Sequence, residues 1–371
     1  MLSRLNSRLY RISLTRMISV INEPILKFIP GSDERLKLEK AIQHVKSQTV
    51  EIPIVIGGKK LSSSDIRYQV SPYEHQRKIA KFSYANKEMI EKAIEHAVSA
   101  QREWDLVPLE ERIKPFMRVA DRISGDDRYK LLAATMVGQG KTIVQAEIDA
   151  AAELIDFLRF NCKYALDLKA IQPIDAPDAT NRSEYRGLEG FVASICPFNF
   201  TAISGNLATA PAIMGCATLW KPPDTGILAS WLLYEMLLEE GVPENVIQFI
   251  PCDGPVFGDA VTQSYHLAAI NFTGSTKTFK QLWKTVANRI DGFRAYPRVI
   301  GECGGKNFHF IHPSFSDLES IIGATVRSAF EYQGQKCSAC SRMYVPQSMW
   351  SKVRDRLVEE TKKIVVGPVS Y

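Results

Sequence analysis

The chain has 371 residues, of which 45% are hydrophobic and 23% are charged, close to the average for soluble globular proteins. This length predicts two or three domains with a large core, and the apolar content excludes an intrinsically disordered chain. The net charge of +5 comes largely from residues 1–22, which hold four arginines and no acidic residue. The remaining 42 basic residues face 41 acidic ones, so the composition favours no nucleic acid as a partner.

The first 22 residues form an Arg- and Ser-rich stretch in which Leu and Ile separate the arginines. This pattern is typical of a mitochondrial transit peptide. A secretory signal would need an unbroken apolar run of about 7–15 residues, which the arginines interrupt. A disordered basic tail is the alternative interpretation.

Residues 190–220 contain no charged residue and are long enough to suggest a membrane span. However, Pro197, Pro211 and several Asn and Gly residues would break such a helix or leave polar groups in lipid. We therefore expect a buried strand, a loop and a buried helix, and no membrane as a partner. The seven cysteines are odd in number and spread along the chain, which favours free thiols in a reducing compartment.

The part that follows the first 22 residues is predicted to be helical and amphipathic. Asn86 is a good N-cap, and the helix after it places apolar residues from Ile90 to Val98 on one face. Residues 108–123 and 146–161 show similar spacing. Residues 172–181 are rich in Pro and Asp, which predicts a loop outside the core.

From Gly190 onward, short apolar strands alternate with helical stretches of about 10–15 residues. The strands are predicted at 191–195, 216–220, 246–250, 267–272 and 298–301. Pro223-Asp224-Thr225 is expected to cap one of the helices, with Gly241 after its end. This alternation predicts an α/β fold with a doubly wound parallel sheet. A strand at 307–311, a helix at about 316–331, a strand at 342–346 and a helix at about 348–362 follow.

Three local motifs are rejected as functional sites. Gly138-Gln-Gly-Lys-Thr142 has Thr135 where a phosphate-binding loop needs glycine, and a helix is predicted before it instead of a strand. His309 and His312 would lie on opposite faces of a strand, with no further ligands nearby. Cys337 and Cys340 form a single CxxC, and zinc would need two more ligands at matching spacing. The sequence therefore predicts no metal site.

Several polar residues are expected together at the carboxyl ends of the predicted strands, where open α/β sheets bind ligands. Cys337 lies in a tight turn next to Lys336, whose charge favours the nucleophilic thiolate. Glu302 ends a strand and is a candidate general base, and Asn199 offers an amide donor to an oxyanion. Residues 272–275 form a strand-to-helix turn whose backbone amides suit a pyrophosphate.

In their order along the chain, these segments resemble motifs of the aldehyde dehydrogenase superfamily. The matching segments are Pro197-Phe198-Asn199, Trp220-Lys221-Pro222, Phe272-Thr273-Gly274-Ser275, Glu302-Cys303-Gly304-Gly305-Lys306 and Gly334-Gln335-Lys336-Cys337. The stretches 197–207, 301–310 and 328–342 are similar to the branch of the superfamily that oxidises L-glutamate γ-semialdehyde to L-glutamate in proline degradation. The resemblance covers nearly everything after the first 22 residues.

The resemblance implies a mechanism. Cys337 attacks the aldehyde, Asn199 and the Cys337 backbone amide bind the oxyanion, a hydride passes to NAD, and Glu302 activates water to hydrolyse the thioester. It also implies that NAD is bound by Lys221, by the main chain around Cys196 and by Gly274, Ser275, Thr276, Lys277 and Thr278. Asp224, three residues after Lys221, is a candidate partner for the ribose 2′-OH, which would favour NAD over NADP. Lys336 and Ser338 flank the nucleophile and are candidate substrate contacts.

The resemblance also implies a domain plan. We expect a mitochondrial transit peptide (1–22), an NAD-binding domain (23–300) with a helical N-terminal part and an oligomerisation flap at about 165–187, and the beginning of an α/β catalytic domain (301–371). Only 34 residues follow Cys337, so the catalytic domain is expected to be incomplete and this chain alone inactive. For the full-length enzyme the family implies a homodimer or higher homo-oligomer, here in the mitochondrial matrix. A non-catalytic product of the same gene, or a dehydrogenase for another aldehyde, are the alternatives.

Overall fold

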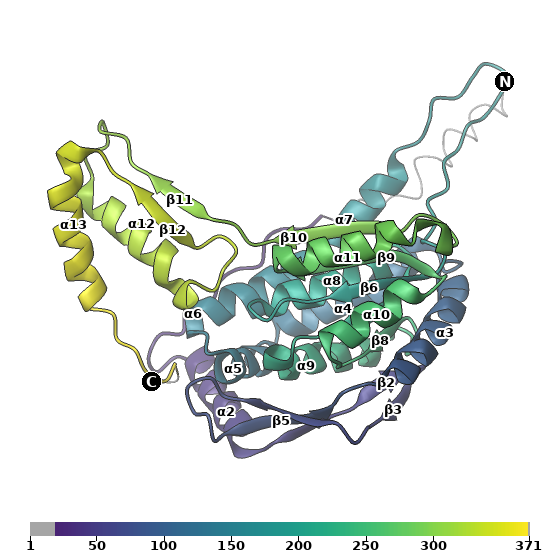
Figure 1. Cartoon of the computed structure of the whole chain (residues 1–371), viewed down its shortest axis with the longest axis horizontal. Coiled ribbons are helices and arrows are strands. Elements are labelled where there is room, and N and C mark those ends of the chain that lie inside the picture. The colour runs from purple at the N-terminus through teal and green to yellow at the C-terminus, as the bar shows by residue number, and fades with distance from the viewer. Residues whose placement is uncertain (1–18, 370–371) are drawn as a thin grey trace.

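Seven strands form the central sheet of the computed structural model, which describes residues 19–369 (Figure 1). In spatial order they are β10 (Arg298–Cys303), β9 (Leu267–Gly274), β6 (Phe191–Ile195), β7 (Ala217–Lys221), β8 (Ile247–Phe249), β2 (Ile54–Ile56) and β3 (Lys59–Leu61). The first five strands are parallel, whereas β2 and β3 extend one edge in antiparallel fashion. The predicted α/β fold with a parallel sheet is therefore confirmed, with two unpredicted strands added at its edge.

The order of the strands reverses at β6. The chain runs from β6 through β7 to β8 in one direction, and then returns to form β9 and β10 on the other side of β6. The loops that leave β6 and β9 therefore diverge, and a crevice at such a switch point is where open α/β sheets bind ligands. This topology directs attention to the loops that begin at Cys196 and Ser275.

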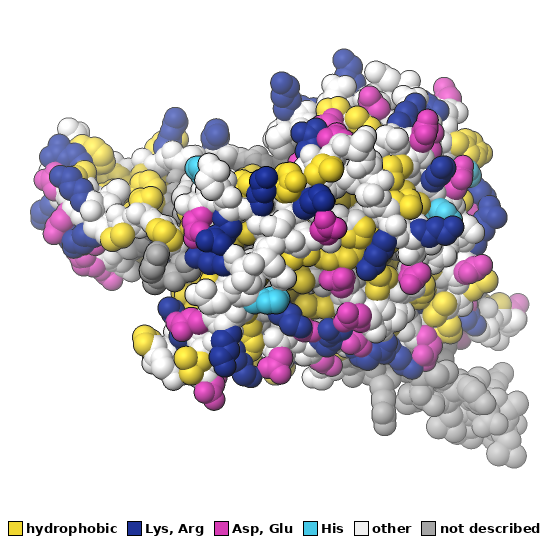
Figure 2. Space-filling model, turned by 90° about the horizontal axis from the view of Figure 1, so that it is seen from below, with side chains coloured by type: hydrophobic (Ala, Val, Ile, Leu, Met, Phe, Trp, Pro, Cys, Tyr) yellow, Lys and Arg dark blue, Asp and Glu magenta, His cyan; other side chains and the backbone are white. Residues whose placement is uncertain are grey.

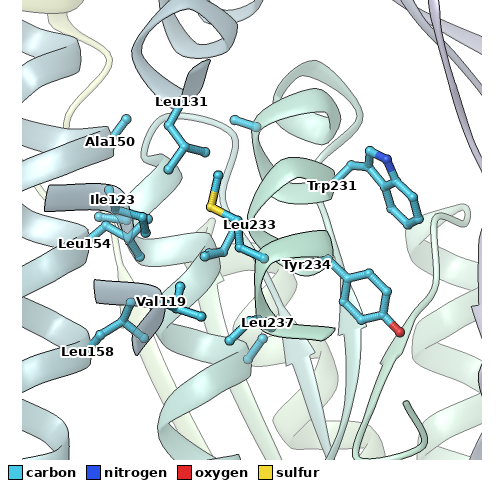
Figure 3. Close-up of a cluster of buried hydrophobic side chains, with 14 of the residues drawn as sticks. Val119, Ile123, Leu131, Ala150, Leu154, Leu158, Trp231, Leu233, Tyr234 and Leu237 are labelled. Carbon is cyan, nitrogen blue, oxygen red and sulfur yellow. The ribbon is translucent and has the colours of Figure 1, made fainter. Parts of the chain in front are cut away.

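Helices cover both faces of the sheet (Figure 1). One face carries α8 (Thr201–Ile213) and α9 (Ile227–Glu239), with α4 (Leu109–Ser124), α5 (Asp127–Gln139) and α7 (Leu154–Ala170) packed beyond them. The other face carries α3 (Lys87–Trp104), α10 (Gly254–Gln263) and α11 (Thr276–Asn288). Figure 3 shows Val119 and Ile123 of α4 close to Leu154 of α7, with Leu233 of α9 opposite them. These apolar contacts provide much of the buried core on this side of the sheet.

The region before residue 84 differs from the predicted helical organisation. It contains α2 (Asp33–Ser47), the edge strands β2 and β3, and a separate three-stranded sheet in the order β1 (Val50–Ile52), β5 (Lys78–Ser83) and β4 (Ile66–Val70). The expectation of a helical N-terminal part was therefore wrong for this region, which is mostly strands. In β4 the buried side chain is Gln69, at 2% exposure, while Ile66 and Tyr68 are exposed. Strands are predicted from apolar residues that alternate with polar ones and face the core. Because β4 buries a polar side chain and exposes apolar ones, this pattern does not reveal it.

The other predicted elements are largely confirmed. Asn86 caps α3 by accepting a hydrogen bond of 2.9 Å from the Met89 N–H, and residues 108–123 correspond to α4. Residues 172–181 form an irregular segment outside the helices. The uncharged stretch 190–220 folds as β6, a loop, α8 and β7, as expected. Within residues 19–369, no helix is both long and apolar enough to cross a bilayer.

Two predictions of local structure need correction. Residues 146–161 do not form one regular helix: α6 (Ile143–Ala146) leads into a π-helical segment, η1 (Glu147–Glu153), before α7 begins. Asp224 does not cap a helix, because residues Asp224–Gly226 form a 3-10 turn, η2, and α9 starts without a side-chain cap. The expected transit peptide lies outside the described residues apart from residues 19–22.

The last part of the chain projects from the body as an arm (Figures 1 and 2). It consists of β11 (Asn307–Phe310), α12 (Leu318–Phe330), the 3-10 turn η4 (Glu331–Gly334), β12 (Cys340–Tyr344) and α13 (Gln347–Lys362). The strands β11 and β12 are parallel, which makes the arm a βαβ unit followed by a helix. Beyond α13 the segment 364–369 returns to the body, where Val369 packs against the core.

Candidate active site

The register of the central sheet places several predicted site residues along one edge. Ile195 of β6 pairs with Lys221 on one side and with Phe272 on the other. Thr273, the next residue of β9, pairs with Glu302 of β10. The carboxyl ends of four neighbouring strands therefore meet at one edge, as the sequence predicted.

The turn between β9 and α11 has the structure of an anion-binding helix start. Ser275 is the N-cap, and its Oγ accepts a hydrogen bond of 3.2 Å from the Thr278 N–H. Thr276 and Lys277 are exposed in the first turn, which contains no acidic residue. Because the free N–H groups and the dipole of a helix start favour negative charge, this end of α11 fits a phosphate group.

Three further predicted cofactor residues surround the ends of β6 and β7. The Lys221 ammonium makes one long contact, 3.5 Å, with the Pro222 carbonyl. The Asp224 carboxylate already accepts a hydrogen bond from the Tyr84 hydroxyl, and burial together with this bond raises the pKa of Tyr84. Burial raises the pKa of the Cys196 thiol to about 12, so this side chain stays neutral near pH 7.

Cys337 lies on an exposed turn directly after η4. The backbone of that turn is unusual, because Tyr332 and Gln333 have φ values of 49° and 54°. Residues other than glycine cost about 1–3 kcal/mol each in such conformations and keep them only where the surroundings enforce them. The turn that presents the thiol is therefore held in place by contacts outside itself.

Asn199 provides one of these contacts. Its Nδ2 donates a hydrogen bond of 2.7 Å to the main-chain carbonyl of Gln335, two residues before Cys337. Asn307 at the start of β11 donates to the carbonyl of Cys337 itself. The structure therefore brings the predicted oxyanion donor to the loop of the predicted nucleophile.

The remaining predicted residues differ in how strongly they are held. The Glu302 carboxylate is exposed and makes no hydrogen bond or ion pair with any residue from 19 to 369. Lys336 is engaged, because its Nζ lies 3.1 Å from Oε2 of Glu331, so its charge is not free to act on the thiol alone. Ser338 is exposed beside Cys337.

A buried ion pair behind these loops was missed by the sequence analysis. The Lys141 ammonium lies 2.6 Å from Oδ2 of Asp149, and both side chains are almost fully buried. Asp149 also accepts hydrogen bonds of 3.0 and 2.9 Å from the Thr201 and Ala202 N–H groups at the start of α8. Lys141 belongs to the rejected phosphate-loop motif, and the helix α5 before it confirms that rejection.

Glu153, at the end of the π-helical segment, was also missed. Burial and the charge of Asp149 raise its pKa to about 7, against the opposing effects of Lys141 and Lys336. The acidic residues of this segment in an otherwise apolar stretch were the available signal. No group of three or more His, Cys, Asp or Glu side chains suited to a metal ion is found in residues 19–369.

Comparison with known proteins gives a consistent result. The model of the aldehyde dehydrogenase family matches residues 61–370. The chain is 60% identical over 350 residues to the mitochondrial delta-1-pyrroline-5-carboxylate dehydrogenase of Rattus norvegicus, covering 94% of this chain and 62% of that protein. The protein of the same name from Homo sapiens is 58% identical over 353 residues, again with 62% of its length covered. The chain thus spans about three fifths of the length of these relatives.

Solved structures agree with the sequence relatives. The delta-pyrroline-5-carboxylate dehydrogenase of Mycobacterium tuberculosis, described as bound with NAD, superimposes with a TM-score of 0.94 at 40% identity. The match covers 96% of this chain and 67% of that one. Together with the motifs at the strand ends, these similarities show that the chain belongs to the aldehyde dehydrogenase family.

Proposed function

We propose that this protein oxidises L-glutamate γ-semialdehyde, which forms from Δ1-pyrroline-5-carboxylate, to L-glutamate with NAD as oxidant. The observation that carries the proposal is the hydrogen bond from Asn199 to the Gln335 carbonyl, which joins the expected oxyanion donor to the loop of the expected nucleophile. The names of the rat and human relatives, delta-1-pyrroline-5-carboxylate dehydrogenase, supply the substrate class. The role in proline degradation is what the resemblance of the motifs implies. Those relatives are named as dehydrogenases, which does not favour a non-catalytic role.

Cys337 acts as the nucleophile in this proposal. Its thiolate sulfur forms a bond to the aldehyde carbon, and the carbonyl electron pair moves to oxygen. The Asn199 amide and the Cys337 backbone N–H donate hydrogen bonds to that oxyanion, where donors are most effective in lowering the barrier. The exposure of the Cys337 thiol at the turn supports this role.

Glu302 acts as the general base of the second half-reaction. Its carboxylate takes a proton from water, and the resulting hydroxide attacks the thioester carbon. The carbon–sulfur bond then breaks, which releases the carboxylic acid and restores the Cys337 thiolate. The absence of any hydrogen bond or ion pair to Glu302 within residues 19–369 leaves its carboxylate available for this step.

The crevice at the strand ends fits NAD. The start of α11, from Gly274 to Thr278, has exposed amides and no acidic residue to repel a pyrophosphate. Lys221 has an ammonium with only one weak contact, suited to ribose hydroxyls, and Cys196 contributes its main chain. When bound, NAD supplies the acceptor for the hydride. The Asp224 carboxylate keeps one oxygen beyond its bond to Tyr84 and would favour NAD over NADP.

The substrate, location and assembly complete the proposal. Lys336 and Ser338 flank Cys337 and contact the substrate.

The Arg-rich first 22 residues direct the protein to the mitochondrial matrix, and the rat and human relatives are named as mitochondrial. Residues 165–187, which start within α7 and extend beyond it, act as a flap in a homodimer or higher homo-oligomer. The 91% exposure of Ile174 in this segment supports that role.

The experiment separates cofactor binding from turnover. NAD binding is measured by fluorescence, and NADH formation is followed with pyrroline-5-carboxylate and with a panel of aliphatic aldehydes. We expect NAD to bind and pyrroline-5-carboxylate to give the highest kcat/KM, whereas NAD binding without any NADH formation would support the sequence-based expectation that this chain alone is inactive. No NAD binding would refute the proposed cofactor site. A higher kcat/KM with another aldehyde would support the alternative, a dehydrogenase of different substrate preference.

A further inference from the structure

Lys141 is enclosed behind the candidate active site. Its side chain is 1% exposed, and its ammonium lies 4.2 Å from the centre of the Phe200 ring and 4.8 Å from that of Tyr332. Asp149 provides the opposite charge at 2.6 Å. Burial lowers the pKa of Lys141, and Asp149 opposes that effect. A desolvated ammonium between two ring faces and a carboxylate is held strongly from three sides.

The three partners of Lys141 come from separate parts of the site. Phe200 directly follows Asn199, the oxyanion donor of the proposed function. Tyr332 is five residues before Cys337 in the strained turn. Asp149 belongs to the π-helical segment and also accepts the first backbone amides of α8, the helix that follows Asn199. A single ammonium therefore contacts both loops that carry the reacting groups.

The turn around Gly140 contacts Tyr332 at two places. Gly140 ends α5 with φ of 71°, and this left-handed turn places Gln139 and Lys141 on either side of it. The Tyr332 hydroxyl donates a hydrogen bond of 2.9 Å to the Gln139 carbonyl, while its ring lies beside the Lys141 ammonium. These two contacts fix a residue whose own backbone conformation is unfavourable.

We propose that Lys141 is a positioning residue for the reaction, which holds the Asn199 loop and the Cys337 turn in their mutual arrangement through Phe200, Tyr332 and Asp149. The inference rests on the proposed function in assigning Asn199 and Cys337 to the chemistry. Lys141 itself touches neither side chain in the described contacts, and it acts through the two rings. Its loss should therefore reduce kcat more than it weakens NAD binding.

The test compares Lys141→Met with Lys141→Arg, which keeps the cation, and with Lys130→Met as a matched control. Lys130 also pairs with a carboxylate at 2.6 Å, that of Asp127, but its side chain is 61% exposed. We measure hydrogen–deuterium exchange of the native protein, NAD affinity, and kcat and KM with pyrroline-5-carboxylate.

We expect Lys141→Met to raise exchange at least tenfold in peptides covering 199–204 and 331–338, and to lower kcat at least tenfold with NAD affinity changed less than threefold. The exchange rates and kcat of Lys141→Arg should lie between those of Lys141→Met and the wild type. Those of Lys130→Met should match the wild type. If Lys141→Met does not fold, Tyr332→Leu takes its place in the test. This variant keeps the Lys141–Asp149 ion pair and should raise exchange in 331–338 but not in 199–204. Unchanged exchange in these segments would overturn the proposal, even if the wild type proved to oxidise a different substrate.

Discussion

The side-chain amide of Asn199 donates a hydrogen bond of 2.7 Å to the carbonyl of Gln335, although the two residues are 136 positions apart in the chain. One belongs to the loop after β6 and the other to the turn that presents Cys337. This contact links the loop after β6 to the projecting arm, and it places an amide donor two residues from Cys337, the proposed nucleophile.

Asn199→Ala should therefore lower kcat by about 10²–10³, the usual cost of a lost oxyanion donor. NAD affinity should stay unchanged, because Asn199 is not among the proposed cofactor contacts. Asn206→Ala is a suitable control, since Asn206 lies on α8 and bonds to Asn161 at 2.7 Å. A kcat loss of similar size in both variants would show that the effect is structural.

Cys337→Ala should abolish NADH formation, because no other group could hold the acyl intermediate. NAD binding should persist, since the crevice is built from the ends of other strands. Cys340→Ala provides the comparison, because Cys340 lies three residues away and its thiol donates to the Arg342 carbonyl. Turnover that survives in Cys337→Ala would contradict the assignment of the nucleophile.

Glu153→Gln should change how stability depends on pH. The pKa of Glu153 rises from its usual value of 4.5 to about 7 in the folded state, chiefly through burial and then through Asp149. Between these two values the folded state binds more protons than the unfolded state, so this residue lowers stability as pH rises from 4.5 to 7. Glutamine mimics the protonated form. We therefore expect Glu153→Gln to have a higher Tm than the wild type at pH 8 and the same Tm near pH 4.5. A Tm difference that does not change with pH would contradict this.

Arg128→Met should destabilise the protein by about 3–5 kcal/mol, because it leaves the buried Glu147 without its cation and Glu23 with Arg159 alone. The Arg128 guanidinium is 1% exposed and binds Glu147 and Glu23, the latter at 2.8 Å. Lys37→Met removes an exposed ion pair with Asp126 and should lower the free energy of unfolding far less than Arg128→Met does. Urea unfolding of both variants measures the difference, and equal losses would argue against a structural role for the buried cluster.

Asp224→Ala should reduce the preference for NAD over NADP, because it removes the carboxylate proposed to repel a 2′-phosphate. The ratio of the two dissociation constants measures this directly. Tyr84→Phe serves as the control, because it frees the Asp224 oxygen that now accepts from the Tyr84 hydroxyl. We expect Tyr84→Phe to keep or strengthen the preference. An unchanged ratio in Asp224→Ala would refute the role.

The sequence predicted the strands of the parallel sheet well because β6, β7, β8 and β9 are each a short apolar run followed by a helix. β6 was predicted at its observed bounds, and the predicted ends of β7 to β10 differ by no more than two residues. Glu302 at the end of β10 and Ser275 at the start of α11 were placed by the same reasoning. Motifs that lie at strand ends are therefore accessible to pattern analysis.

Long-range packing was not accessible in this way. Lys141 sits in a polar, glycine-rich motif that suggests a surface loop, and nothing local indicates that Asp149, Phe200 and Tyr332 enclose it. The pairing of Lys336 with Glu331 was missed for a different reason: the two residues are five apart, not at the i,i+3 or i,i+4 spacing of helical ion pairs, and the left-handed residues of the turn lie between them. Such features depend on tertiary contacts that a single sequence does not display.

The arm is attached to the body at both of its ends. It leaves β10 through Gly304 and Gly305, and the segment after α13 returns so that Val369 packs on the core. A swing about the glycine pair would have to pull that returning segment away from the body. Because the arm is held at both of its ends, bending at the two glycines should change the distance between Asn199 and the Cys337 turn only slightly.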